Sequence, residues 1–269
     1  MLRAVLFRGN PGLMRELALF AGGGGGILGS KLLGWDTVCA VEIDPFARSV
    51  LLARQRDGAL SCFPIWDDVR TFDGALWRER VDVISGGFPC QDISSAGKRA
   101  GLDGSRSGLW FEFARIIGEV RPRFAFIENS PRLVSNGLDR VLGSLSGMGY
   151  NARWGILGAR HVGAPHRRDR VWILAHTDNE GQRAQSEHVE MASASEDVCD
   201  DHGQPLRSKP FPKREGEAIG RTGAWDEIPN LARVDDGLAR RVDRIRATGN
   251  GQVPAVARLA WEILSDGLL

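Results

Sequence analysis

Short apolar segments alternate with longer amphipathic ones between residues 15 and 175, and this alternation limits the folds open to the chain. Repetition of strand and helix is typical of α/β domains, in which helices cover both faces of a mostly parallel sheet. Such sheets bind their ligands at the carboxyl ends of the strands. We therefore expect a doubly wound, mostly parallel α/β sheet. The expected strands are Leu17–Phe20, Thr37–Val41, Ser61–Ile65, Val81–Ser85, Phe124–Glu128, Ala152–Leu157 and Val171–Ala175.

Two further segments have the apolar spacing of helices. Residues 109–120 lie between the fourth and fifth expected strands, and Pro122 helps to end that helix. Residues 252–264 resume a helical pattern near the C-terminus, and we expect this helix to pack back onto the sheet. The apolar faces consist of Leu109, Phe113, Ile116, Ile117 and Val120 in the first helix, and of Val253, Val256, Leu259, Ala260, Ile263 and Leu264 in the second.

The composition changes near residue 177, where a polar stretch begins that holds more acids than bases. Few apolar residues precede Trp225, so this stretch is typical of a small appended region or an extended insertion. We expect three parts: an α/β domain over residues 1–176, a small region over 177–236, and a C-terminal segment over 237–269 that returns to the α/β domain.

The totals describe an ordinary globular protein: 269 residues, 42% hydrophobic and 26% charged, with a net charge of +1. No apolar stretch is long enough for a membrane span, and the N-terminal apolar stretch is too short for a signal peptide. No C-x-x-C pair occurs, so neither a metal site nor a disulfide framework is indicated, and we expect a cytoplasmic monomer with reduced thiols. The cysteines are Cys39, Cys62, Cys90 and Cys199.

A run of five glycines, Gly22–Gly26, follows the first expected strand. Glycines let a backbone approach a ligand closely and leave the amides of the next helix free, although a plain flexible turn has the same composition. Glu42 ends the next strand about 20 residues later, where an acid binds ribose hydroxyls. This layout serves dinucleotides and also S-adenosylmethionine. Asp68, beyond the third strand, is either an acceptor for an adenine amino group or a capping acid.

Cys90 and Glu128 both follow strands of the same expected sheet. Cys90 lies on a turn shaped by glycine and proline, a position from which a thiol can reach a cleft. A nucleophile and an acid at neighbouring strand ends favour covalent catalysis assisted by a proton donor. The plainer alternatives are an inert buried cysteine and a structural carboxylate.

Basic side chains mark two further segments. The glycine-rich loop 92–108 carries Lys98, Arg99 and Arg106, and it is either a loop that closes over a polyanion or a solvated surface loop. Arg168 and Arg170 alternate at the start of the last expected strand, so their side chains should point the same way. Such a pair can hold a carboxylate, a base carbonyl or phosphates, or it can form the salt bridges of an edge strand.

Six motifs in this order resemble those of the DNA (cytosine-5)-methyltransferases. The resemblance covers roughly Leu17–Ala175 and Gly249–Leu264 and implies the fold of S-adenosylmethionine-dependent methyltransferases, with residues 177–236 as a small target-recognition region. Its carriers are Phe20–Gly26, Val41–Asp44, Gly87–Gln91, Ile127–Asn129, His166–Arg170 and Gly249-Asn250.

The resemblance also implies roles in methyl transfer to C5 of a flipped-out cytosine in duplex DNA. Cys90 would add to C6 and Glu128 would assist at N3. Arg168 and Arg170 match the family's arginine pair, of which Arg170 would help to orient the base and the glutamate. The implied S-adenosylmethionine contacts are Phe20, Ala21, Gly22, Gly24, Glu42, Ile43, Asp68, Val69, Gly87, Pro89 and Asn250, the last also bracing the active-site loop. The implied DNA contacts are Gln91, Ser94, Lys98, Arg99 and Arg106. A cognate restriction nuclease would be a natural partner.

Three alternatives stay open from the sequence. The same machinery can methylate cytosine in tRNA, although no Cys-Phe-Thr signature of the tRNA-type members is present. A nicotinamide-dependent oxidoreductase would share the glycine run and Glu42, but it has no use for the Pro-Cys-Gln turn. A DNA-binding module without activity would not need Cys90, Glu128 and Arg170 together.

Overall fold

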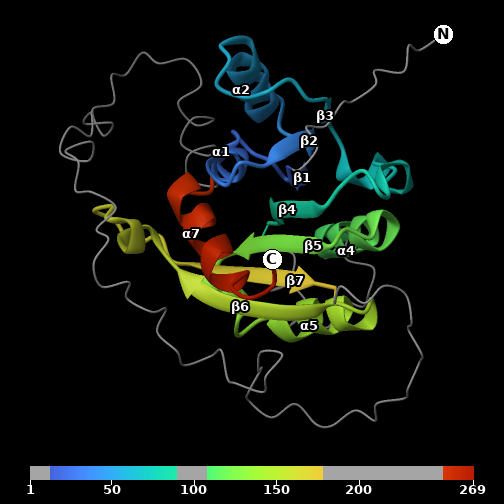
Figure 1. Cartoon of the computed structure of the whole chain (residues 1–269), viewed down its shortest axis with the longest axis vertical. Helices are drawn as coiled ribbons and strands as arrows, with labels where there is room; N and C mark the ends of the chain where they lie inside the picture. Colours follow the sequence, from blue (N-terminus) through green and yellow to red (C-terminus); the bar gives the residue numbers. More distant parts are fainter. Residues whose placement is uncertain (1–12, 90–107, 178–250) are drawn as a thin grey trace.

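The computed structural model describes residues 13–89, 108–177 and 251–269, and its centre is a seven-stranded sheet in the order β3-β2-β1-β4-β5-β7-β6 (Figure 1). The pairs from β3 to β5 are parallel, and β7 runs antiparallel to both of its neighbours. The expectation of a doubly wound, mostly parallel α/β sheet is confirmed. The strands are β1 (Arg15–Leu19), β2 (Asp36–Val41), β3 (Ile65–Trp66), β4 (Val83–Gly87), β5 (Phe124–Asn129), β6 (Asn151–Leu157) and β7 (Arg170–His176).

Helices cover both faces of this sheet. Successive side chains of a strand point to opposite faces, and in these strands the side chains on both faces are mostly apolar. Leu17 and Ile127 contribute to the core beneath α4 and α5, whereas Phe124 and Phe126 pack on the other face with α7. A third cluster joins β1 and β2 to α1 and α2. The helices are α1 (Gly25–Leu32), α2 (Pro45–Arg56), α4 (Gly108–Val120), α5 (Leu138–Gly147) and α7 (Pro254–Leu264), with 3-10 turns η1 (Val69–Thr71), η2 (Ala75–Trp77), η4 (Pro131–Leu133) and η5 (Ala159–Val162).

Local sequence signals fix where several helices begin and end. Asp44 caps α2, since its carboxylate accepts the backbone N–H groups of Phe46 at 2.7 Å and Ala47 at 3.1 Å. α4 ends at Val120, where Arg121 takes a left-handed φ of 54° and Pro122 follows. The helix expected over residues 109–120 is thereby confirmed.

The C-terminal helix packs on the sheet as expected, but it begins two residues later than its apolar pattern indicates. Pro254 occupies the first turn of α7, where backbone N–H groups have no partner within the helix, so the N–H that proline lacks is not needed. Trp261 of this helix packs edge-on against Phe124 at 5.2 Å and against Trp35 at 4.5 Å between ring centroids. α7 therefore closes the second face of the sheet.

The expected strand over residues 61–65 is wrong, because β3 comprises only Ile65 and Trp66. Phe63 contributed to the apolar pattern of that segment, and it is buried against Ile27 and Leu51 without joining the sheet. Among the described residues no helix is long and apolar enough to cross a membrane. The region expected over 177–236 lies outside the described residues except for Thr177.

Candidate active site

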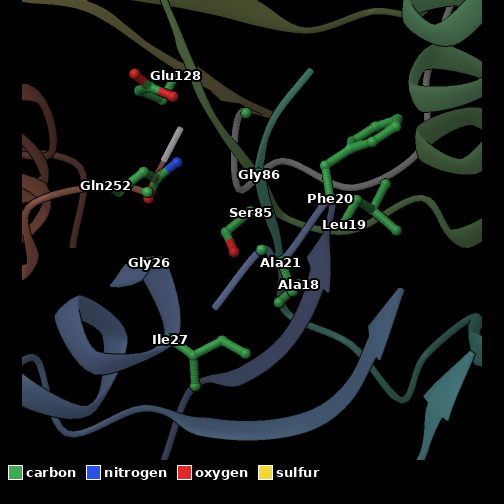
Figure 2. Close-up of a pocket in the computed structure, with 13 residues that line it drawn as sticks. Ala18, Leu19, Phe20, Ala21, Gly26, Ile27, Ser85, Gly86, Glu128 and Gln252 are labelled. Atoms are coloured by element: carbon green, nitrogen blue, oxygen red, sulfur yellow. The ribbon is translucent and has the colours of Figure 1, made fainter. Parts of the chain in front are cut away.

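A pocket opens at the carboxyl ends of β1 and β4, where the glycine loop meets the segment before α7 (Figure 2). It encloses about 390 Å³ of space, part of which is open to solvent. The lining residues are Ala18, Leu19, Phe20, Ala21, Gly22, Gly26, Ile27, Ser85, Gly86, Gly87, Glu128, Gly251 and Gln252.

The glycine loop has a defined shape and is not a plain flexible turn. Phe20, Gly22 and Gly24 all have positive φ values of 52°, 55° and 91°, and the amide of Ala21 donates to the carbonyl of Val41 at 3.1 Å. Glycine is the residue that takes such angles without strain, which explains its use at two of these positions. The ring of Phe20 stacks on Phe113 with centroids 6.0 Å apart, which holds the end of β1 in place.

Glu42 fixes this loop to the end of β2. Its Oε2 accepts the amide of Gly22 at 2.6 Å, and its Oε1 accepts the amide of Asp44 at 2.8 Å. The side chain is buried, so these bonds satisfy a carboxylate that has left bulk water. Each carboxylate oxygen can accept more than one hydrogen bond, so Glu42 can also accept hydrogen bonds from the hydroxyl groups of a ligand.

The adenine-side candidates stand apart from the pocket lining. Asp68 caps η1 and binds Arg70, whose Nη2 lies 2.6 Å from Oδ2, and this hydrogen bond lowers the pKa of Asp68. Ile43 is 59% exposed beyond β2, whereas Val69 is buried in the core. A ligand amino group would therefore share the Asp68 carboxylate with Arg70.

Glu128 is the acid of the site, and it is buried at the end of β5. Burial raises its pKa above the ordinary 4.5, although the charges of Arg170 and Arg168 and a hydrogen bond from Gln252 oppose that shift. The Nε of Arg170 lies 2.8 Å from Oε1 of Glu128. A carboxyl group in this setting can both carry a proton and return to a paired anion.

The charge of Arg168 also acts on this carboxylate, but strand alternation does not place it there. Arg168 precedes β7 and has a left-handed φ of 38°, so the expected strand geometry does not apply to it. Its Nη2 donates to the carbonyl of Gly251 in the segment before α7. Burial, followed by the neighbouring charge of Arg170, lowers the pKa of Arg168.

Gln252 is a pocket residue that the sequence analysis did not assign. Its side chain hydrogen-bonds Glu128. Its Oε1 lies close to Gly26, so that a Cβ added to Gly26 would be only 2.5 Å from it. Figure 2 shows Gln252 in the pocket with both residues. Gln252 thus connects the glycine loop to the acid. The one signal in the sequence was a polar side chain between the Gly249-Asn250 motif and an apolar helix.

The thiol turn begins beside the acid. Gly87 of β4 pairs in register with Glu128 of β5, and Asn129 donates from Nδ2 to the carbonyl of Phe88 at 2.9 Å. Pro89 is exposed and is the last described residue before Cys90. Seven expected site residues lie outside the described ranges: Cys90, Gln91, Ser94, Lys98, Arg99, Arg106 and Asn250.

The residues around the pocket suit S-adenosylmethionine in their chemistry. Gly26, Gly86 and Gly87 line the pocket, and neighbouring protein atoms leave no room for a Cβ at any of them. The buried carboxylate of Glu42 bonds the glycine loop and keeps the capacity to accept ribose hydroxyls.

Comparisons with known proteins agree with this geometry. A family model described as C-5 cytosine-specific DNA methylase matches residues 14–218. The chain is 29% identical over 272 residues to the Type II methyltransferase M.Eco47II of Escherichia coli, covering 91% of this chain and 61% of that protein. It is 36% identical over 163 residues to the Type II methyltransferase M.CviJI of Paramecium bursaria Chlorella virus IL3A, covering 60% and 42%.

A solved structure shares the fold. The solved structure of the Entamoeba histolytica methyltransferase EhMeth matches with a TM-score of 0.61 at 14% identity, over 96% of this chain and 99% of that one. The chain spans less than two thirds of the length of the curated relatives it matches. The family model nevertheless covers well over half of the 269 residues, and the chain therefore belongs to the C-5 cytosine-specific DNA methylase family.

Proposed function

We propose that this protein transfers a methyl group from S-adenosylmethionine to C5 of a cytosine in duplex DNA. The observation that carries the proposal is Glu128, a buried acid with a raised pKa, held by Arg170 at the rim of a glycine-lined pocket. Family membership supplies the reaction class, and the acid supplies a reason why a pyrimidine ring would be activated here.

The chemistry begins from the poor nucleophilicity of cytosine C5. The Cys90 thiolate forms a bond to C6, the C5=C6 electron pair shifts to C4–C5, and the C4=N3 pair shifts to N3, which takes the proton of Glu128. The C4=C5 pair then forms the bond from C5 to the methyl carbon while the bond between that carbon and the donor sulfur breaks, and C4=N3 re-forms as N3 returns its proton to Glu128. Loss of the C5 proton to water restores C5=C6 and expels the thiolate. General acid catalysis of this kind contributes about 10²–10⁴-fold to the rate.

Residues of this chain would hold the methyl donor, which supplies an electrophilic methyl group on sulfur when bound. Its binding site would be formed by Phe20, Ala21, Gly22 and Gly24. Glu42 would accept hydrogen bonds from the ribose hydroxyls. The remaining proposed contacts are Ile43, Asp68, Val69, Gly87, Pro89 and Asn250. Among them, Asp68 would accept the adenine amino group in competition with Arg70.

The substrate must leave the base stack, because a duplex hides both faces of its bases. We assign the backbone and base contacts to Gln91, Ser94, Lys98, Arg99 and Arg106, with target recognition by residues 177–236. Arginine and lysine in such a loop would neutralise phosphates. The Type II relatives favour a cognate restriction nuclease as a partner.

Mechanism-based trapping tests the proposal. Expression in a methylation-free host, followed by sequencing of methylated cytosines, identifies the target. A duplex with 5-fluorocytosine at that position and the methyl donor should then give a covalent adduct, because fluorine cannot leave as a proton does. Cys90→Ala should form none, and Cys62→Ala, which changes an exposed cysteine, should trap normally. Methylation of tRNA but not of DNA by the same preparation would refute the proposed substrate.

A further inference from the structure

A carboxylate with three hydroxyl partners lies beneath the pocket and has no part in the proposed mechanism. Glu16 sits in β1 with no exposed surface. Its Oε1 accepts from Ser30 and from Ser85 at 2.5 Å each, and its Oε2 accepts from Thr37 at 2.6 Å. These partners belong to α1, β4 and β2, so one side chain joins three elements around the pocket.

Ser85 differs from the other two hydroxyl residues because it also lines the pocket, where Figure 2 draws it together with Ala21 and Gly26. Its side chain thus faces Glu16 on one side and the ligand space on the other. Ser30 and Thr37 are buried and do not contribute to that lining.

The direction of the Ser85 hydrogen bond determines what its oxygen offers to a ligand. A hydroxyl has one hydrogen and two lone pairs, and an ionised carboxylate only accepts. Because the Ser85 hydrogen goes to Glu16, the oxygen presents acceptor lone pairs toward the pocket. Burial raises the pKa of Glu16, and the hydrogen bonds from Ser30, Ser85 and Thr37 oppose that shift. With its hydrogen on Glu16, the Ser85 oxygen can accept a hydrogen bond from an N–H donor of a ligand.

We propose that Ser85, oriented by Glu16, accepts a hydrogen bond from the ammonium group at the amino-acid end of the methyl donor. This inference rests on the proposed function, which makes S-adenosylmethionine the ligand. The sheet order supports the assignment, since β2 and its acid Glu42 lie on one side of β1 and β4 with Ser85 on the other. A ligand whose ribose meets Glu42 and whose length crosses β1 has its amino-acid end near Ser85. Glu16 acts as a positioning residue.

Binding measurements without DNA test this role, using S-adenosylhomocysteine and its analogue that lacks the amino group. Ser85→Ala should weaken binding of S-adenosylhomocysteine by about tenfold, as expected for a hydrogen bond to a charged group. It should change binding of the deaminated analogue less than twofold. Glu16→Gln should show the same selectivity, because the glutamine amide can donate to Ser85 and occupy its lone pairs. Ser146→Ala, an exposed serine on α5, should bind both ligands as the wild type does.

The other possible binding results would each overturn the inference. Equal losses for both ligands would assign Ser85 a purely structural role, and no loss for either would remove it from the site. Ser85→Ala keeps the test valid even where Glu16→Gln fails to fold, since Ser30 and Thr37 still bond the carboxylate. Wild-type protein that binds neither ligand would instead refute the cofactor of the proposed function, and the inference with it.

Discussion

Arg170 donates from Nε to Oε1 of Glu128 over 2.8 Å, and this pair lies at the junction of β5 and β7. The two strands are antiparallel neighbours, so the acid and its cation come from segments more than forty residues apart in the chain. The guanidinium orients the carboxyl group, but burial still raises the pKa of Glu128. The site thereby keeps an acid that is both aligned and able to carry a proton.

Glu128→Gln should reduce methyl transfer by about 10²–10⁴-fold, the usual contribution of a general acid. Glutamine fills the same space and bonds Arg170, but it cannot give up a proton to N3. The rate is measured as transfer of a labelled methyl group to duplex DNA. Glu262→Gln is the matched control, because Glu262 lies on the outer face of α7 and pairs with Arg258. Full activity in Glu128→Gln would contradict the assigned role.

The stability of the protein should depend on pH through Glu128. The pKa of Glu128 is about 4.5 in the unfolded chain and higher in the native state. At a pH between the unfolded and the native pKa, the native state therefore holds a proton that the unfolded chain has lost. The native state binds more protons there, and the free energy of unfolding falls as pH rises through that window. The Glu128→Gln variant has no carboxyl group at this position, so its free energy of unfolding should not show this fall. Urea titrations of both proteins across the window should show the wild type losing stability relative to the variant, and a constant difference would be the contrary result.

Arg170→Met should destabilise the protein by about 3 kcal/mol above the native pKa of Glu128, because it leaves a buried carboxylate without its main partner. The double variant Arg170→Met with Glu128→Gln should recover much of this loss, since no buried charge remains. Chemical denaturation of the two single variants and the double variant measures the coupling. Strict additivity of the two changes would show that the ion pair carries no energy.

Gly25→Ala should weaken both folding and ligand binding. A Cβ at Gly25 would overlap the backbone carbonyl of Gln252, so the segment before α7 must shift. Overpacking of this kind costs about 1–3 kcal/mol. Gly143→Ala in α5 is the control, because nothing lies near its Cβ, and it should stabilise the helix by about 0.5–1 kcal/mol. Thermal unfolding and S-adenosylhomocysteine binding measure both effects.

The sheet and the acid Glu128 could be predicted from the sequence because both depend on local patterns. Apolar runs locate six of the seven strands to within about two residues, and Glu128 follows one of them. The segment before β3 misleads because Phe63 is buried by side-chain packing without strand pairing. Burial produces the apolar pattern in both situations, so the pattern cannot separate them.

The polar contacts of the pocket could not be read from the chain in this way. A carboxylate in a buried strand contradicts an apolar pattern, and the expected first strand accordingly began after Glu16. The partners that make its burial tolerable are 14, 21 and 69 residues away along the chain, in Ser30, Thr37 and Ser85. Gln252 is likewise joined to Glu128 only by the return of α7 to the sheet. Such networks follow from tertiary structure, which single-sequence patterns do not encode.

The hydrogen bond from Arg168 to the carbonyl of Gly251 joins the segment before β7 to the segment before α7, and α7 in turn packs against η5 and β7. On the other side of positions 178–250, Thr177 donates its amide to the carbonyl of Arg123. The described residues that flank these positions are thus both tied to the sheet domain that holds Glu128. If residues 177–236 recognise the DNA target, as we propose, a change of target sequence there would leave the anchoring of the acid untouched.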